Sequence, residues 1–302
     1  MSSSAPASAS PKPPPASAAP PAGGVIPGGH PVGALRTVRS DRWWLGPLAT
    51  ALGLGAFAVY ATVRAFQGTH YFADPYLSPF YSPLLFANPE YWPGSPVEHS
   101  WFGALPGWLA EIWPSWLPVS PAFFILVFPG SFRATCYYYR KAYYRSFFAT
   151  PAGCAVCPIG QKNYRGETRL FLIQNLHRYA LYASIPFVAI LTWDGILALR
   201  KDGEWGIGVG TVMLFLNAGL IGAYLFGCHS FRHLIGGRLD RFASAAGVPG
   251  VAHRIWRGVS WLNARHMKFA WASLIWVALA DLYVWAVSEG WIADWNTWGN
   301  GE

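Results

Sequence analysis

The amino-acid sequence predicts an all-α membrane protein, a bundle of about five transmembrane helices behind an N-terminal tail rich in Pro, Ala and Ser. Hydrophobic residues make up 53% of the 302 residues and charged residues only 12%, whereas soluble domains carry about 25% charged residues. The mean hydropathy is +0.25 although the N-terminus is polar, so long apolar segments must lie elsewhere. The apolar content excludes a disordered chain, and the 4 Cys exclude a disulfide-stapled secreted scaffold.

The chain divides into a tail and one membrane domain. Residues 1–34 hold Ser, Ala, Pro and Gly with a single charged residue, Lys12, and such a composition cannot form a core. We therefore predict a disordered tail over residues 1–34 and a transmembrane domain over residues 35–302. Apolar runs long enough to cross a bilayer place the predicted spans near residues 43–66, 120–141, 171–199, 206–228 and 267–288.

The second span is the least regular of the five. Pro118, Pro121 and Pro129 lie before or within it, and proline interrupts the hydrogen-bond ladder of a helix. We nevertheless expect one helix, which continues beyond the apolar part as far as Lys141.

Three glycines, Gly206, Gly208 and Gly210, alternate at the start of the fourth span. Their spacing superficially resembles a dinucleotide-binding loop, but no predicted strand precedes them. We expect them to permit close packing of helices.

Lys and Arg are concentrated in alternate connections between the predicted spans. They are frequent before the first span, between the second and third, and between the fourth and fifth, whereas the connection 67–117 contains Asp and Glu but no Lys or Arg. Because positively charged loops stay in the cytoplasm, we predict a cytoplasmic N-terminus and an exoplasmic C-terminus. This distribution accounts for the net charge of +8 without a nucleic-acid partner.

Cysteine and histidine side chains gather at the predicted cytoplasmic boundary of the spans. They are Cys136, Cys154, Cys157, Cys228, His177, His229, His233 and His266. Any one of them alone is more often a packing or helix-end residue than a ligand. Together they indicate a metal centre, because thiolates suit iron–sulfur clusters or zinc and imidazoles suit haem, zinc or iron.

Three kinds of metal centre fit these residues, and the residue types alone do not choose among them. Bis-imidazole haem needs two His at equal depth on neighbouring helices, for which His177, His229 and His266 are candidates. Structural zinc could use Cys154 and Cys157 with two His. A mixed iron–sulfur cluster needs two thiolates on one iron and two imidazoles on the other.

Several short motifs stand out along the chain. They are Phe132-Arg133-Ala134-Thr135-Cys136-Tyr137-Tyr138-Tyr139-Arg140-Lys141-Ala142-Tyr143-Tyr144-Arg145, Pro151-x-x-Cys154-Ala155-Val156, Gln174-Asn175-x-His177-Arg178-Tyr179, Cys228-His229-Ser230-x-Arg232-His233, and Tyr76-Leu77-Ser78-Pro79-Phe80-Tyr81-Ser82-Pro83. Together they resemble the membrane-anchor subunit of an actinobacterial-type succinate dehydrogenase, respiratory complex II. The resemblance covers roughly residues 40–290, and its Tyr-rich motif is the specific one.

This resemblance implies a five-helix anchor for a flavoprotein and an iron–sulfur protein in the cytoplasmic (inner) membrane of a bacterium. Similar anchors carry a Rieske-type [2Fe–2S] cluster inside the membrane region in place of haem. The candidate ligands, four of which would hold the cluster, are Cys136, Cys154, Cys228, His177, His229 and His233. Cys157 lies outside the family's pattern, and His266 fits the haem b alternative better.

The resemblance further implies the quinone-reducing subunit of a succinate:quinone oxidoreductase, with the succinate-oxidising site on the flavoprotein and menaquinone as the expected quinone. The candidate quinone-binding residues are Tyr137, Tyr138, Arg140 and Lys141, and the candidate proton-relay residues are Asp194 and Asp281. An interfacial aromatic belt, positive-inside charge and polar helix pairing explain the same residues equally well. The alternatives are a haem b anchor and a non-redox scaffold or transporter subunit, although no inverted repeat favours transport.

Overall fold

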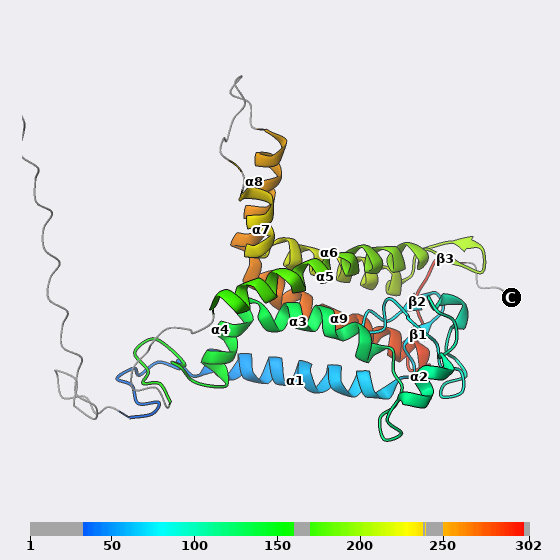
Figure 1. Ribbon diagram of the computed structural model, residues 1–302, viewed down its shortest axis with the longest axis horizontal. Helices are drawn as coiled ribbons and strands as arrows, with labels where there is room; N and C mark the ends of the chain where they lie inside the picture. The colour runs from blue at the N-terminus through cyan, green and yellow to red at the C-terminus, as the bar shows by residue number, and fades with distance from the viewer. Residues whose placement is uncertain (1–32, 160–169, 238, 240–249, 299–302) are drawn as a thin grey trace, which may run out of the picture.

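Long apolar helices dominate the computed structural model, which describes residues 33–159, 170–237, 239 and 250–298. Of the described helices, four are long and apolar enough to cross a membrane. They are α1 (Leu45–Gln67), α5 (Leu170–Leu197), α6 (Val209–Phe226) and α9 (His266–Ser288), and they form a bundle in Figure 1. A further apolar helix, α3 (Ala122–Thr135), is shorter and packs against α5. The predicted membrane helical bundle is confirmed, whereas the predicted tail lies outside the described residues as far as residue 32.

The expectation of one continuous helix through residues 120–141 is wrong, because the chain breaks at Cys136. α3 ends at Thr135, Cys136 has extended backbone angles (φ −61°, ψ 131°), and α4 (Tyr137–Ser146) follows. Pro129 is accommodated inside α3, so proline does not cause the break. Figure 1 shows α4 leaving the line of α3 toward α1. The break buries the Cys136 side chain, which is 3% exposed.

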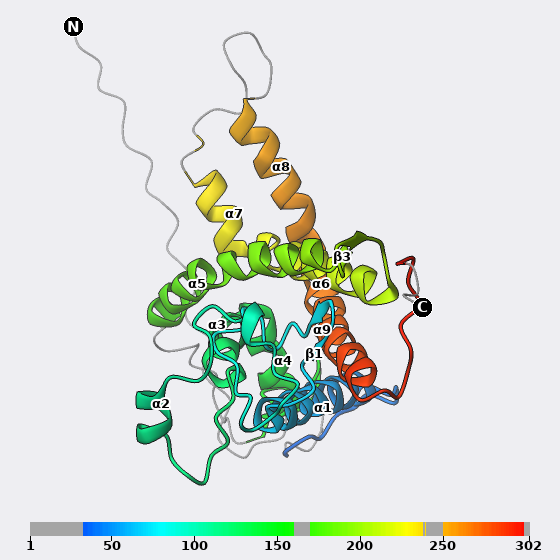
Figure 2. The same cartoon turned by 90° about the vertical axis from the view of Figure 1, so that its right-hand side faces the viewer.

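The connection between α6 and α9 contains a helical hairpin that the hydropathy pattern does not predict. It consists of α7 (His229–Gly236) and α8 (Val251–Ala264). Cys228 caps α7, because its sulfur accepts a hydrogen bond from the backbone N–H of Ser230 at 3.3 Å. In Figures 1 and 2 both helices stand across the direction of the long helices.

The connection between α1 and α3 folds over one end of the bundle, which we call the loop end. It contains the antiparallel strands β1 (Phe72–Ala73) and β2 (Tyr76–Leu77), the 3-10 turn η1 (Val97–His99) and the short helix α2 (Gly107–Ile112). A second antiparallel pair, β3 (Arg200–Lys201) and β4 (Glu204–Trp205), joins α5 to α6 at the same end (Figure 1). We call the opposite end, where Cys136 and Cys228 lie, the cysteine end.

The prediction that the glycines at the start of α6 permit close packing of helices is wrong about their partners, because the side chains that approach them belong to the loop end and the C-terminal segment. A Cβ atom on Gly208 would clash with the hydroxyl of Tyr76, and one on Gly210 would lie 2.6 Å from the Tyr76 ring. A Cβ atom on Gly206 would lie 2.6 Å from the Trp298 ring. These contacts hold the start of α6 against the loop end.

Candidate metal centre

Two thiol and two imidazole side chains from different segments lie together in the core at the cysteine end. Cys136 lies between α3 and α4, His177 lies in α5, Cys228 lies between α6 and α7, and His266 begins α9. Cys136 is 3% exposed, Cys228 2% and His177 9%. Nε2 of His177 lies 3.0 Å from the sulfur of Cys228, and Nε2 of His266 lies 3.5 Å from the sulfur of Cys136. The side chains therefore form two Cys–His pairs.

Two neighbours orient the His177 ring. The Thr135 hydroxyl donates a hydrogen bond to the carbonyl of Ser131 at 2.7 Å, so its oxygen is available to accept one from Nδ1 of His177 at 2.9 Å. The Phe132 ring stacks on the imidazole with 4.8 Å between centroids. When the proton is held on Nδ1, the lone pair of Nε2 faces Cys228. This tautomer of the imidazole is the one that can bind a metal through Nε2.

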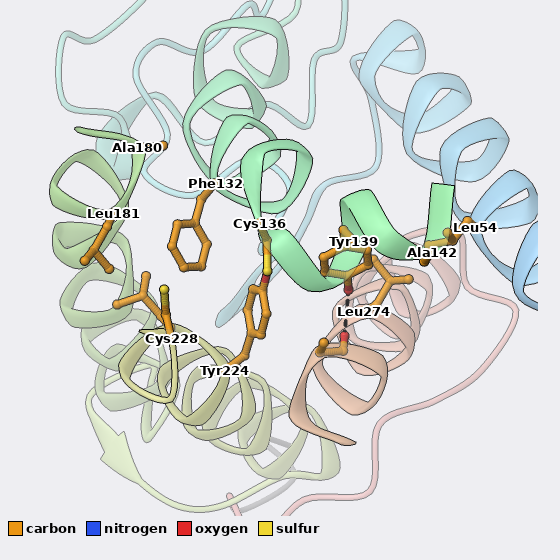
Figure 3. Close-up of a cluster of buried hydrophobic side chains, with 12 residues drawn as sticks. Leu54, Phe132, Cys136, Tyr139, Ala142, Ala180, Leu181, Tyr224, Cys228 and Leu274 are labelled. Carbon is orange, nitrogen blue, oxygen red and sulfur yellow. Dashed lines mark hydrogen bonds between the residues drawn. The ribbon is translucent and has the colours of Figure 1, made fainter. Parts of the chain in front are cut away.

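Tyr224 of α6 holds the His266 ring in a similar way. The two rings stack with 4.9 Å between centroids and 20° between planes. The Arg133 guanidinium lies 4.7 Å from the centre of the Tyr224 ring and donates a hydrogen bond to the Tyr139 hydroxyl at 2.8 Å. Figure 3 shows the Tyr224 hydroxyl pointing toward the sulfur of Cys136. The positive charge of the Arg133 guanidinium favours a negatively charged group, such as a pair of thiolates, at this position.

Burial raises the pKa of the Cys228 thiol to about 11, and the charge of nearby Cys136 adds to the rise. A thiolate here therefore needs a positive charge beside it, which a bound metal supplies. Two thiols beside two imidazoles form a donor set that suits zinc or a mixed-ligand [2Fe–2S] cluster.

The relative positions of these four donor side chains can be compared with the ligand positions that a single ion or a cluster requires. Among the described residues, no three His, Cys, Asp or Glu side chains converge on one ion position. A single zinc ion would require such convergence, whereas a two-iron cluster offers separate positions to its thiolate and imidazole ligands. The closest contacts in this structure each join one thiol to one imidazole, whereas a Rieske-type cluster needs both thiolates on one iron and both imidazoles on the other. The pairing by itself therefore does not choose between a two-iron cluster and a single ion.

The family model of the actinobacterial succinate dehydrogenase subunit SdhC matches residues 45–290. The chain belongs to this family. Its fold is also similar to a chain of the Mycobacterium smegmatis Sdh1 complex in the apo form, with 41% sequence identity, a TM-score of 0.76, and coverage of 90% of this chain and 97% of that one. A search of curated protein sequences found no match. This SdhC-family chain is therefore a membrane subunit of a succinate dehydrogenase complex, with flavoprotein and iron–sulfur subunits as its partners.

The structure of this SdhC-family chain brings together Cys136, Cys228 and His177 from the predicted ligand pool. It adds His266, which by its sequence position fitted the haem b alternative better. The signal for His266 is its position, because it begins the last span at the same boundary as the other residues. The residues around His266 form no motif that would mark it as a ligand, whereas His229 and His233 share a recognisable motif with Cys228.

The structure does not bring the other three predicted ligands into this site. Cys154 is exposed, and its backbone carbonyl accepts a hydrogen bond from Arg39 at 3.0 Å, near the start of the described chain. His229 and His233 are exposed on α7, where Nδ1 of His233 lies 3.1 Å from a guanidinium nitrogen of Arg178.

The predicted quinone-binding residues all lie on α4, directly after Cys136. Tyr137 is 66% exposed and Lys141 is also exposed. The Tyr138 hydroxyl accepts a hydrogen bond from Nε1 of Trp271 at 2.7 Å. Arg140 is buried, with its guanidinium 5.6 Å from the centre of the Tyr137 ring. The helix thus presents both exposed and buried polar groups beside the candidate metal centre.

The predicted proton-relay residues lie toward the loop end. Asp281 is fully buried and forms an ion pair with Arg64, with 2.8 Å between Nε and a carboxylate oxygen. It also accepts hydrogen bonds from the hydroxyls of Tyr60 and Ser78. These contacts match the helix-pairing alternative, because they join α1, α9 and the loop end. Asp194 accepts a hydrogen bond from the Ser82 hydroxyl in the same loop, and a relay role for either carboxylate stays a prediction.

Proposed function

We propose that this subunit transfers electrons from the iron–sulfur subunit of succinate dehydrogenase to a membrane quinone through a Rieske-type [2Fe–2S] cluster. Cys136, Cys228, His177 and His266 would hold that cluster, and when bound it would supply a one-electron carrier between partner and quinone. The observation that carries the proposal is the meeting of two thiols and two imidazoles, drawn from different segments, in a core that contains aromatic rings and Arg133.

The chain's own residues prepare the site for such a group. Thr135 and Phe132 fix the ring of His177, and Tyr224 stacks on that of His266. Neutral imidazoles in place of two thiolates lower the negative charge of the centre, which raises its reduction potential above that of an all-thiolate centre. That direction favours reduction of the centre by the iron–sulfur subunit.

We place the quinone beside α4, with menaquinone as the expected substrate. Tyr138 and Arg140 carry donor groups on the inner side of this helix, while Tyr137 and Lys141 carry them on the exposed side. Donors of this kind hydrogen-bond to quinone carbonyl oxygens and stabilise the negative charge that develops on them. The position of α4 directly after Cys136 supports a short distance between quinone and metal centre.

The cysteine end is proposed to face the cytoplasm and to receive the iron–sulfur subunit. The Lys- and Arg-rich connections lie at this end, and positive loops stay inside. α1 begins at the cysteine end, whereas α9, the last helix, ends at the loop end in Figure 1. The N-terminus would thus be cytoplasmic and the C-terminus exoplasmic.

Histidine variants of the intact complex test the metal centre. We expect His177→Ala and His266→Ala to abolish the Rieske-like electron paramagnetic resonance signal, with its low average g value, and to abolish quinone reduction. Oxidation of succinate with a soluble dye should persist on the partner subunits. His229→Ala and His233→Ala are matched controls, because these exposed residues lie on the next helix after Cys228, and both should retain the signal.

Two results would contradict the proposal. Iron analysis of the wild-type complex could account only for the partner's clusters, which would leave no iron for this subunit. Alternatively, haem could be extracted in stoichiometric amount, and the haem b alternative would then apply, with His177 and His266 as its axial candidates.

A further inference from the structure

The α7–α8 hairpin projects sideways from the bundle at the cysteine end. It stands upright in both Figure 1 and Figure 2, whereas the long helices run horizontally in Figure 1. It follows α6 directly and ends at Arg265, immediately before α9. Since α6 and α9 cross the membrane, a hairpin set across them runs along the membrane surface.

One stripe of α8 is apolar and exposed. Val251 is 63% exposed and Ile255 is 50% exposed. Leu262 follows Ile255 by two helical turns and shares its side of the helix, because successive residues turn by about 100°. Gly258 lies between them on the same side, and a Cβ atom there would meet nothing within 4 Å. Within the described chain, the stripe is therefore uncovered from Val251 to Gly258, whereas Leu262 is half-buried.

The stripe faces the membrane side of the hairpin. Leu262 lines an apolar groove between α5 and α6, together with Val188, Phe215 and Phe226. Because α5 and α6 are membrane-spanning helices, a side chain that lines their outer groove points toward the bilayer. Ile255 and Val251 share the side of α8 on which Leu262 lies, so they point the same way.

Arginine side chains flank the stripe. Arg254 is exposed and directly precedes Ile255, and the Arg265 guanidinium lies 4.1 Å from the centre of the Trp261 ring, which is 54% exposed. α8 contains no Asp or Glu. Apolar residues beside arginine and tryptophan are the composition of helices that lie in the headgroup region.

We propose that the α7–α8 hairpin is an interfacial anchor that binds anionic phospholipids of the leaflet at the cysteine end. Val251 and Ile255 enter the acyl boundary, while Arg254 and Arg265 bind lipid phosphates. Arginine suits this role because its guanidinium makes paired hydrogen bonds to phosphate, and basic clusters near the surface attract anionic lipids. The orientation of the stripe favours lipid over a soluble subunit, because the stripe faces the bilayer. The assignment goes beyond electron transfer and does not depend on the metal centre.

Spin labels on opposite sides of α8 test the depth of the hairpin. The complex would carry Cys154→Ser and Cys157→Ser to remove the accessible native thiols of this chain. One spin label would then be attached at either Ile255→Cys or Arg257→Cys. These positions are two residues apart and lie on opposite sides of the helix. In nanodiscs of phosphatidylcholine and phosphatidylglycerol, we expect the label at 255 to collide with oxygen more than with a soluble nickel chelate. The label at 257 should show the reverse.

Lipid analysis of the purified complex gives a second readout. Arg254→Gln should lose bound phosphatidylglycerol, whereas Arg257→Gln should retain it, since Arg257 lies on the far side of α8 from the stripe. Contact of the label at 255 with the nickel chelate would place the stripe in water and overturn the proposal. Protection of that label from both reagents would show a protein cover instead of lipid and would overturn it as well.

Discussion

Cys136 combines a backbone role with a chemical one. Its extended conformation ends α3 and starts α4, so its sulfur turns into the core, where Nε2 of His266 lies 3.5 Å away. The preceding residue, Thr135, ends α3 and contacts His177. Adjacent residues at one helix break thus contact both imidazoles of the site.

Thr135→Val tests this arrangement at the level of a single hydroxyl. Valine keeps the shape of threonine but removes the oxygen that accepts from Nδ1 of His177, so the ring loses its fixed tautomer. Loss of such a supporting hydrogen bond costs about 10- to 100-fold in metal affinity. We expect a corresponding fall in cluster iron, measured by iron analysis and the paramagnetic signal after dialysis against a chelator.

Thr192→Val is the matched control for this variant. Thr192 also lies in a membrane helix, and its hydroxyl donates a hydrogen bond to the backbone carbonyl of Val188 at 2.7 Å. No hydrogen bond to an imidazole is found for Thr192 in the described chain. The complex with Thr192→Val should retain its cluster iron. Equal iron affinity in both variants would show that stacking by Phe132 alone orients the ring.

Among the helices, α1 and α9 are joined by the buried pair of Arg64 and Asp281. Both side chains are 0% exposed, and Arg64 also donates hydrogen bonds to Gln67 and to the backbone carbonyls of Thr69 and His70. A buried charge without its partner is costly. The pair therefore sets which faces of the two helices meet and where the loop end attaches.

Asp281→Asn should destabilise the bundle strongly, because it leaves the Arg64 charge buried without a counter-charge. Breaking a buried pair costs about 3–5 kcal/mol, which thermal unfolding of the purified complex would detect. Asp194→Asn, whose carboxylate accepts from the Ser82 hydroxyl, should cost less. An unchanged melting temperature in Asp281→Asn with slowed quinone reduction would instead support the predicted relay.

For the whole molecule, the two ends of the bundle differ in composition and in structure. The loop end is an ordered cap rich in aromatic residues, with Tyr71 stacked on Tyr81 at 4.3 Å between centroids. The cysteine end carries the basic connections and the candidate metal centre. This asymmetry is the physical basis for the proposed orientation in the membrane.

Labelling from outside intact cells tests that orientation. A cysteine introduced at Asp202, in the exposed turn between β3 and β4, should react with an impermeant reagent before lysis. The native exposed Cys154, at the cysteine end, is the internal control and should react only after lysis. The opposite order of labelling would place the cysteine end outside and refute the proposed docking of the iron–sulfur subunit there.

Composition and hydropathy were sufficient to predict the membrane class, the long spans and the boundary at which Cys and His gather. These properties are local, because a run of apolar residues has a length and a depth whatever its neighbours are. The resemblance in short motifs was sufficient to indicate the family that the family model then confirmed.

Only the tertiary structure decided which of the boundary residues meet. Depth along the membrane is one coordinate, and Cys154, His229 and His233 share it with His266, yet only His266 faces Cys136. The other coordinate is the lateral position around the bundle, which depends on packing between α3, α5, α6 and α9. The break at Cys136 and the sideways hairpin could not be predicted for a related reason. Both turn the chain out of the direction of the spans, and the hydropathy of a segment contains no information about its direction.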